Sequence, residues 1–181
     1  MTTIKEQIKM LRKSILAAGA CAVAAGAVLM SNSVVPTSHA SDLQVADAHE
    51  MAAVKQRQQT MKDVGGNMKI IAEFVKASKG SAAEASAAAA KIGELATSIP
   101  EIFEVKATLE QMDTVGKNRS KPEIWSDWDG FLERGKVLED EAAKMAAVLN
   151  SGDAGTIQAQ FATFGKEGCG GCHTTYRGPE T

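Results

Sequence analysis

Strand-forming patterns are missing from this sequence of 181 residues. Aromatic residues make up only 4% of it, only four prolines occur, and no run of β-branched or aromatic side chains alternates with polar ones. This excludes a fold built on half-buried strands, because such strands carry an apolar residue at every second position. An all-α fold with the helical period of 3.6 residues is the remaining expectation.

A membrane-spanning run is also lacking. The one long apolar stretch, residues 14–30, is shorter than the ~20 residues needed to cross a bilayer and is rich in Ala and Gly rather than Leu. Four basic residues precede it, and the tripeptide SHA at 38–40 offers the small residues that a signal peptidase reads. We therefore predict a signal peptide over residues 1–40, cleaved after Ala40, rather than a retained anchor or a lipoprotein site at Cys21.

The sequence has no surplus of basic residues. It holds 20 Lys and Arg against 22 Asp and Glu, and residues 1–40 take four of the basic and one of the acidic residues. The exported chain, residues 41–181, is then one periplasmic domain with 16 basic and 21 acidic side chains, formally −5. Nucleic acid is excluded as a partner because nothing would neutralise its phosphates, whereas an acidic protein that meets a basic partner fits this charge.

The first helical pattern runs from about Asp47 to Ser78. Its apolar residues recur at steps of three, four and seven, as one face of a helix requires. They are Val54, Met61, Val64, Met68, Ile71 and Val75. Gly80 stands just past the end of the pattern, where glycine commonly terminates a helix.

The second helical pattern covers residues 81–99. Ser81 at its start and Glu84 three residues later form the capping-box arrangement, in which each side chain satisfies the backbone N–H of the other residue. Pro100 closes this helix, because proline cannot continue the backbone hydrogen bonds of a helix interior.

Two further helices follow a long connection. Residues 101–121 form this connection, with a short helix expected around 104–112. The third helix begins near Pro122, since proline suits the first helical turn, and the breaker residues 150–152 separate it from a fourth helix that starts at about Asp153. The fourth helix carries its stripe on Ile157, Phe161, Phe164, Gly168 and Cys172. Two of the three connections are short, so the expected fold is an antiparallel four-helix bundle in which the fourth helix ends beside the earlier part of the first.

Cysteine and histidine gather near the C-terminus in the pentapeptide CGGCH at 169–173, which is the C-x-x-C-H pattern of c-type haem attachment. Two thiols three residues apart can each form a thioether to one of the two vinyl groups at a haem edge, and the next residue then reaches the iron. We therefore predict one covalently attached haem c, with Cys169 and Cys172 as the thioether residues and His173 as the proximal axial ligand.

Three other readings of this pentapeptide are weaker. A thioredoxin-like redox pair belongs at a strand-to-helix turn, and no strand is predicted. A structural zinc site needs four ligands, and the exported chain adds only His49 to the set. A structural disulfide between Cys169 and Cys172 suits an oxidising compartment but leaves His173 without a role, and it defines a haem-free bundle as the remaining alternative.

Taken together, these residues resemble the class II c-type cytochromes, the cytochrome c′ group. The resemblance covers most of residues 48–177. It rests on Arg57-Gln58 followed by Met61, Gly65 and Met68, on RSKPEIW at 119–125, and on the C-x-x-C-H pentapeptide followed by Tyr176-Arg177. It implies a haem at the C-terminal end of a four-helix bundle, Arg57 and Gln58 at a haem propionate or the haem edge, and a homodimer through the first two helices.

The resemblance also addresses the far side of the iron. In this group the residue three or four positions after the Arg-Gln pair faces the iron, as a Met ligand in low-spin members and as a non-coordinating side chain in five-coordinate ones. The stretch RQQTMKD at 57–63 is more similar to the low-spin members, so we predict Met61 as the distal axial ligand and Met68 as core. His49 lies twelve residues before Met61, about 18 Å along a helix, so both cannot reach one iron.

These features predict a periplasmic monohaem c-type cytochrome that carries single electrons with His/Met ligation and meets redox partner proteins of the periplasmic electron-transfer chain. The alternative is a five-coordinate cytochrome c′ that binds nitric oxide or other small gases. No nucleophile–base pair or second cofactor motif is visible, so no enzymatic turnover is predicted. No stable membrane insertion is expected after removal of the signal peptide.

Overall fold

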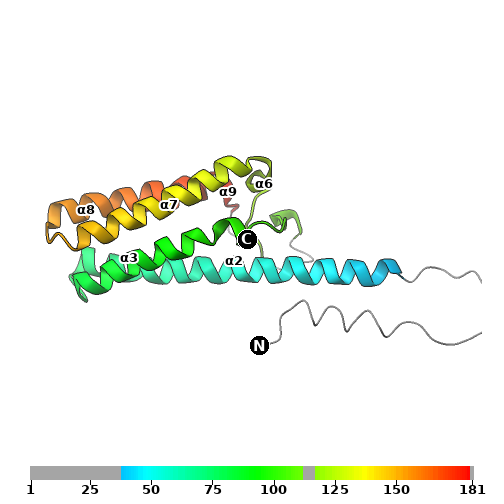
Figure 1. The fold of residues 1–181 in the computed structure, drawn as a ribbon, viewed down its shortest axis with the longest axis horizontal. Helices are drawn as coiled ribbons and strands as arrows, with labels where there is room; N and C mark the ends of the chain where they lie inside the picture. The colour runs from blue at the N-terminus through cyan, green and yellow to red at the C-terminus, as the bar shows by residue number, and fades with distance from the viewer. Residues whose placement is uncertain (1–37, 112–116, 180–181) are drawn as a thin grey trace, which may run out of the picture. The chain divides into compact units, whose positions relative to one another are not determined.

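The protein is described by a computed structural model over residues 38–111 and 117–179 (Figure 1). The predicted signal peptide lies outside the described residues up to residue 37, so it stays a prediction. Within the described part the regular structure is helical, and the only extended pairing is an isolated antiparallel bridge between Ser120 and Arg177. The all-α prediction is confirmed.

The first helix, α2 (Ser38–Ala77), is longer than predicted. It begins nine residues before the expected start at Asp47, so the predicted cleavage after Ala40 falls within its first turn. Its end agrees with the prediction, because Ser78 and Gly80 adopt positive φ angles of 50° and 78°. A left-handed residue stops a helix, and glycine takes that conformation without a steric cost.

The second helix, α3 (Ala82–Thr97), begins with the predicted capping box. The Ser81 hydroxyl accepts from the Glu84 backbone N–H at 3.2 Å, and the Glu84 carboxylate accepts from the Ser81 backbone N–H at 2.8 Å. Two of the N–H groups that a helix start leaves without partners are thereby satisfied.

The segment after α3 differs from the prediction. Pro100 lies in the first turn of a new short helix, α4 (Ile99–Ile102), so it starts a helix as well as following one. Of the short helix predicted around 104–112, the described part holds only the 3-10 turn η1 (Leu109–Gln111). Arg57 accounts for the irregular structure here, because its guanidinium donates hydrogen bonds to three backbone carbonyls. They are the carbonyls of Ile102, Val105 and Ala107. A carbonyl bonded to a side chain is less available for a helix. Residues 103–122 are hereafter the connection, and its described residues, 103–111 and 117–122, are largely irregular.

The third predicted helix is interrupted. It consists of α6 (Glu123–Ser126) and α7 (Trp128–Leu149), separated by Asp127 with φ −126° and ψ 54°. The Asp127 carboxylate accepts a hydrogen bond from the Tyr176 hydroxyl at 2.6 Å. It also lies over Gly130, where an added Cβ would come within 2.5 Å of it. At the break, Asp127 thus bonds a side chain from the end of the chain, and its carboxylate would have to move if residue 130 carried a Cβ.

The fourth predicted helix contains a π-helical segment that the sequence did not predict. Its parts are α8 (Ala154–Thr163), η2 (Phe164–Gly170) and α9 (Gly171–Tyr176), hereafter the fourth column. The Asp153 side chain caps α8 by accepting from the Gly155 N–H at 3.1 Å. Gly168 lies where an added Cβ would be 3.0 Å from the Phe164 ring and 3.3 Å from a Leu138 methyl. π-Helical turns often occur at functional sites, and this one ends inside the C-x-x-C-H pentapeptide.

The helices pack as the predicted bundle. The α3 helix packs on α2 and α7, and α7 packs on the fourth column. Phe164, Ile92, Met145, Leu149 and Ile71 are the largest fully buried side chains. The backbone of α2 approaches α8, but within the described residues no Cα atom of α2 comes within 8 Å of one in η2 or α9. The bundle is therefore closed at the α8 end and open where the fourth column finishes.

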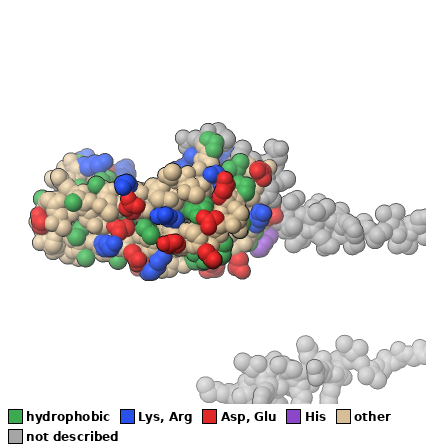
Figure 2. Space-filling view, turned by 90° about the horizontal axis from the view of Figure 1, so that it is seen from above, with side chains coloured by type: hydrophobic (Ala, Val, Ile, Leu, Met, Phe, Trp, Pro, Cys, Tyr) green, Lys and Arg blue, Asp and Glu red, His purple; other side chains and the backbone are tan. Residues whose placement is uncertain are grey.

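The surface carries acidic and basic side chains side by side, and the hydrophobic ones on the face in Figure 2 are scattered. Among the described residues, Ile70 is the one large hydrophobic residue that is classed as exposed, at 44% of its surface. None of the helices within the described ranges is long and apolar enough to cross a membrane.

Candidate haem site

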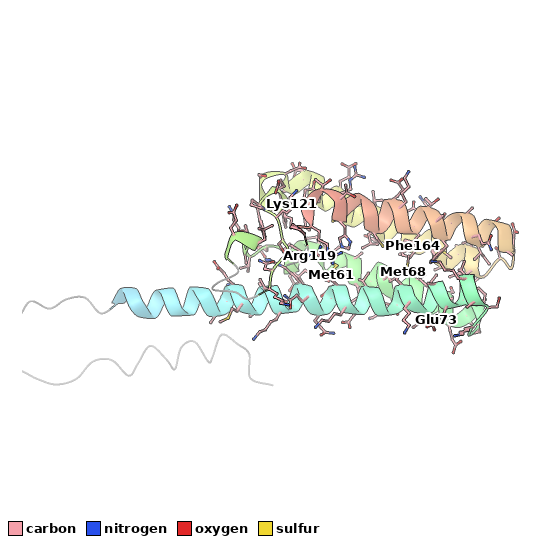
Figure 3. The ribbon with its side chains drawn as sticks, turned by 180° about the vertical axis from the view of Figure 1, so that it is seen from behind. Met61, Met68, Glu73, Arg119, Lys121 and Phe164 are labelled. Carbon is pink, nitrogen blue, oxygen red and sulfur yellow. The ribbon has the colours of Figure 1, made fainter. Side chains whose placement is uncertain are left out.

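A cavity of about 600 Å³ lies at the open end of the bundle, between α2 and the end of the fourth column. Its lining includes every residue predicted for the site, namely Arg57, Gln58, Met61, Cys169, Cys172 and His173. Figure 3 shows Met61, Met68 and Arg119 in the space between α2 and the fourth column. Two segments more than a hundred residues apart in sequence thus form opposite walls of one cavity.

The C-terminal wall carries the thiols and the imidazole. Cys169 is in η2, Cys172 and His173 are in α9, and neither cysteine forms a disulfide. Burial raises the pKa of the Cys172 thiol to about 11, with Arg134 opposing and Cys169 adding to the shift, and burial raises the pKa of Cys169 as well. Both thiols are therefore uncharged at neutral pH in this wall.

His173 is held in its neutral form. Burial lowers the pKa of its imidazole, and the positive charges of Arg177 and Arg119 lower it further. A neutral imidazole keeps a lone pair on one ring nitrogen, which is the form that ligates a metal. The His173 carbonyl accepts from the Arg177 N–H at 3.3 Å, so the predicted ligand lies in the last turn of α9.

The α2 wall presents two methionines on the cavity side. Met61 and Met68 both line the cavity and are both partly buried. Gly65 lies between them, and an added Cβ there would meet no atom within 4 Å, so this part of the wall is flat and open. The Met68 methyl lies 3.9 Å from the Cβ position of Gly165 in η2, whereas Met61 lies nearer the open end in Figure 3. Met68 therefore contacts η2 across the cavity, whereas Met61 lies toward the open end of the bundle.

Arg57 lines the cavity, but its nitrogens are bonded to the connection. It is only 3% exposed, its Nε donates to the Ile102 carbonyl at 2.8 Å, and its Nη1 donates to the Ala107 carbonyl at 3.1 Å. Its Nη2 donates to the Val105 carbonyl. The guanidinium also lies 4.7 Å and 5.2 Å from the ring centroids of Phe103 and Trp125, within cation–π range. Arg57 thus holds the connection against α2, and its contact with a haem propionate stays a prediction.

The charge on Arg57 survives this burial. Burial lowers the pKa of its guanidinium to about 10, while the negative charge of Glu50 acts in the opposite direction. Arg57 is therefore still cationic at neutral pH. Its neighbour Gln58 is exposed and donates from Nε2 to the Lys117 carbonyl, which gives α2 a second tie to the connection.

The connection in turn holds the end of the fourth column. The Lys121 N–H donates to the Tyr176 carbonyl at 3.1 Å, and the Gly178 N–H donates to the Arg119 carbonyl at 2.7 Å. The Arg119 Nε donates to the Gly178 carbonyl at 2.8 Å. Both walls are therefore attached to the connection, and this role of the connection was not predicted from the sequence.

Cations surround the cavity without carboxylates. Lys62, Lys117, Arg119 and Arg177 line it besides Arg57, and no described Asp or Glu does. In a chain with more acidic than basic residues, this concentration of positive charge suits an anionic ligand group such as a propionate. Sequence reasoning missed Lys62, Lys117 and Arg119 as lining residues. The basic cluster from Lys117 to Lys121 was the only available signal.

The residues present fit a covalently bound haem. The C-terminal wall offers two thiols and a neutral imidazole, and the facing wall offers the Met61 thioether one helical turn from Gly65, where the space is open. The lining also includes many apolar residues and several cations. A haem needs these properties from a c-type site: attachment, an axial nitrogen ligand, a water-excluding surface and partners for its propionates.

Comparisons with known proteins agree with this site. The family model for cytochrome c′ matches residues 52–177. A cytochrome c-556 from Agrobacterium tumefaciens (strain II Chrys) is 33% identical over 125 residues, which cover 68% of this chain and 95% of the relative. The solved cytochrome c′ from Thermochromatium tepidum is similar with a TM-score of 0.62 and 25% identity, covering 72% of this chain and 97% of that one.

A second similar solved structure contains a bound ligand. It is a nitric oxide complex of a cytochrome c prime variant from Alcaligenes xylosoxidans, with a TM-score of 0.57 and 25% identity over 70% of this chain and 94% of that one. The solved neighbours are four-helix bundles, which confirms the predicted architecture.

Proposed function

The chain belongs to the cytochrome c′ family, and we propose that it is an exported, periplasmic monohaem cytochrome that carries single electrons with His173 and Met61 as its axial iron ligands. The observation that carries the proposal is the meeting of these two residues in one cavity from opposite walls. A cavity closed on both faces by protein ligands favours electron transfer over ligand capture, because neither axial position is left open.

Each side chain then has a defined task. The bound haem supplies the one-electron chemistry. Cys169 and Cys172 fix its position, neutral His173 donates a ring nitrogen, and the Met61 thioether donates a sulfur lone pair that carries no charge. A thioether paired with imidazole raises the reduction potential relative to a second imidazole. The apolar lining excludes water from the site and thereby limits the reorganisation that accompanies a change of charge.

The proposal extends to partners. Redox partner proteins of the periplasm exchange the electron with this carrier, and two copies of the chain associate through α2 and α3. Ala83, Ala87 and Ala90 are exposed on α3 at helical spacing, and small side chains on one face allow a second helix to approach closely. Sedimentation equilibrium of the holoprotein tests the dimer, since a single species at monomer mass would contradict it.

A second candidate function is the capture of nitric oxide or another small gas by a five-coordinate iron. It is favoured by the solved nitric oxide complex of the related cytochrome c prime variant. In that case Met61 covers the distal face without ligating, and its side chain moves aside for the gas.

Optical spectra of the purified holoprotein separate the two candidates. The electron-carrier proposal predicts low-spin spectra in both the oxidised and the reduced state, with slow carbon monoxide binding because Met61 must first leave. A high-spin reduced spectrum with rapid carbon monoxide binding would replace it with the gas-binding candidate.

A further inference from the structure

A second hollow, of about 470 Å³, lies on the surface formed by α4, α6 and the start of the connection and of α7. It is lined by Pro100, Glu101, Glu104, Trp125 and Trp128, hereafter the indole groove. Both tryptophans are partly buried and both glutamates are exposed. Two partly exposed indoles lining one hollow form an aromatic surface of the kind that is enriched at protein interfaces.

The charge of the indole groove is of one sign. Glu101 and Glu104 have no ion-pair partner among the residues that the structure describes, and no Lys or Arg lines the groove. The haem cavity is the opposite, with cations and no described carboxylate in its lining. Arg57 lies over the Trp125 ring and Phe131 stacks on the Trp128 ring, so one face of each indole is already covered. The remaining indole surface beside two carboxylates is complementary to a cation, which gains both cation–π and charge attraction. The groove therefore fits a positively charged group.

The indole groove also shares a wall with the haem cavity. The Trp128 ring stacks on Phe131 with centroids 5.7 Å apart, and Phe131 meets Tyr176 edge-on at 5.2 Å. Phe131 and Tyr176 both line the haem cavity. Trp125 reaches the same wall, since its Nε1 donates to the Phe103 carbonyl at 2.8 Å. A group held in the groove is thus separated from the cavity by one layer of packed aromatic side chains.

We propose that the indole groove is the docking surface for a basic redox partner protein, which places a lysine or arginine side chain between the two indoles and the carboxylates of Glu101 and Glu104. This inference rests on the proposed electron-carrier function. The acidic balance of residues 41–181 attracts such a partner over a longer distance. The groove then selects where the partner settles, next to the wall that borders the haem cavity.

The two tryptophans provide a direct readout, because the sequence contains no others. Their indole N–H groups give two signals in a nitrogen-15 correlation spectrum of the labelled holoprotein. A short lysine-rich peptide is the probe, and a glutamate-rich peptide of equal length is its control. The expected result is that the lysine-rich peptide shifts both indole signals in a saturable manner and that the control peptide shifts neither. Saturating peptide without a shift of either indole would overturn the proposal.

A charge-matched pair of variants tests the site itself. The test variant is Glu101→Gln with Glu104→Gln, and the control is Glu73→Gln with Glu94→Gln, which removes the same charge elsewhere. Glu73 lies at the closed end of the bundle (Figure 3), and it and Glu94 pair with Lys69 and Lys91 on exposed helix faces. We expect the test variant to bind the lysine-rich peptide about fivefold to tenfold more weakly and the control to change binding less than about twofold. Equal weakening in both variants would show unspecific attraction and overturn the proposal.

Two further measurements keep the outcomes apart. Tetramethylammonium should bind at least about tenfold more weakly than the peptide, because a single small cation lacks the neighbouring charges of a protein surface. Equal affinity would make the groove a small-cation site and contradict docking of a protein. The reduction potential and spin state of the test variant should equal those of the wild type. If the wild type proves to be five-coordinate while the peptide still binds in the groove, the electron-carrier function fails and the cation-binding surface stands. If the holoprotein is low-spin but the groove does not bind the lysine-rich peptide, only the docking proposal is contradicted.

Discussion

The two walls of the haem cavity are built in different ways. The C-terminal wall takes its proposed attachment and ligand residues from five consecutive positions, so the local sequence is sufficient to predict them. The α2 wall takes Met61 and Gly65 from a helix whose periodic pattern has many equivalent positions. Which residue of this helical pattern faces the iron depends on the packing of α2 against the connection. Haem attachment is therefore a local property of this chain, whereas ligation of the far side is a tertiary one.

The hydrogen bonds that hold the two walls in place also differ. The α2 wall is fixed by a buried cation, Arg57, which is bonded to three backbone carbonyls of α4 and the connection. The C-terminal wall is held by hydrogen bonds that include the one from the Tyr176 hydroxyl to the carboxylate of Asp127, a residue exposed to solvent. Water competes less for the hydrogen bonds of a buried charge than for those of an exposed one, so the two walls should respond unequally to the loss of these hydrogen bonds.

The largest effect is expected from the C-terminal wall itself. Replacing both Cys169 and Cys172 by Ser removes the two thiols and with them every covalent bond to haem. The Soret band should then be lost from the protein in acidified organic solvent, whereas Met61→Ala should retain it. A haem that stays attached in the double Ser variant would contradict the assignment of these cysteines. If the wild type carries no covalent haem, the alternative of a haem-free bundle would be supported instead.

Stability should be more sensitive to loss of the Arg57 hydrogen bonds that hold the α2 wall. Replacing Arg57 by Met leaves the Ile102 and Val105 carbonyls without this partner, although the Ala107 carbonyl still accepts from Asn118 at 2.8 Å. We expect the free energy of unfolding to fall by about 3 kcal/mol, measured by urea unfolding of the holoprotein. Gln58→Ala is the matched control, because its exposed bond to Lys117 should be worth less than about 1 kcal/mol.

The outcome for Arg57 also distinguishes its two assigned roles. A loss of stability below about 1 kcal/mol, accompanied by a large change in reduction potential, would mean that Arg57 serves mainly a haem propionate. A large loss of stability with little change in potential is the result expected from its bonds to the backbone.

The smallest effect on stability should come from loss of the Tyr176–Asp127 hydrogen bond, and this effect should depend on pH. The hydrogen bond to Asp127, together with burial and the negative charge of Asp127, raises the pKa of Tyr176 to about 12 from the ordinary value of 10.0. Because the folded-state pKa is raised, the contribution to stability is fully present below pH 10 and is lost as pH rises toward 12. Tyr176→Phe should lower stability by about 1 kcal/mol at pH 7, and the difference from wild type should shrink above pH 10. A difference that is constant from pH 7 to 11 would contradict the bond.

Several parts of the structure were predictable because they depend on neighbouring residues. The capping box of Ser81 and Glu84 is a local pattern, and so is the C-x-x-C-H pentapeptide. The helical stripes follow from periodicity, because a helix of a bundle has to bury one face. The bundle itself follows from short loops between such helices.

Other parts were not predictable because their causes lie far away in sequence. The break at Asp127 depends on Tyr176, 49 residues later, and the irregular connection depends on Arg57, 48 residues before Val105. An arginine after a helical stripe gives no sign that it will be buried against backbone carbonyls. The π-helical segment likewise packs Gly168 against Leu138 of α7, a contact that the local sequence does not reveal, as well as against Phe164 of the same segment.

The optical spectrum of the Met61→Ala holoprotein tests the central claim most directly, with Met68→Ala as its control from the same wall. Met61→Ala should convert a low-spin spectrum into a high-spin one, because the thioether that closes the distal face is removed. Met68→Ala should leave the spin state unchanged and cost only stability. A low-spin spectrum that persists in Met61→Ala, or that is lost in Met68→Ala instead, would contradict the assignment of Met61 as the iron ligand.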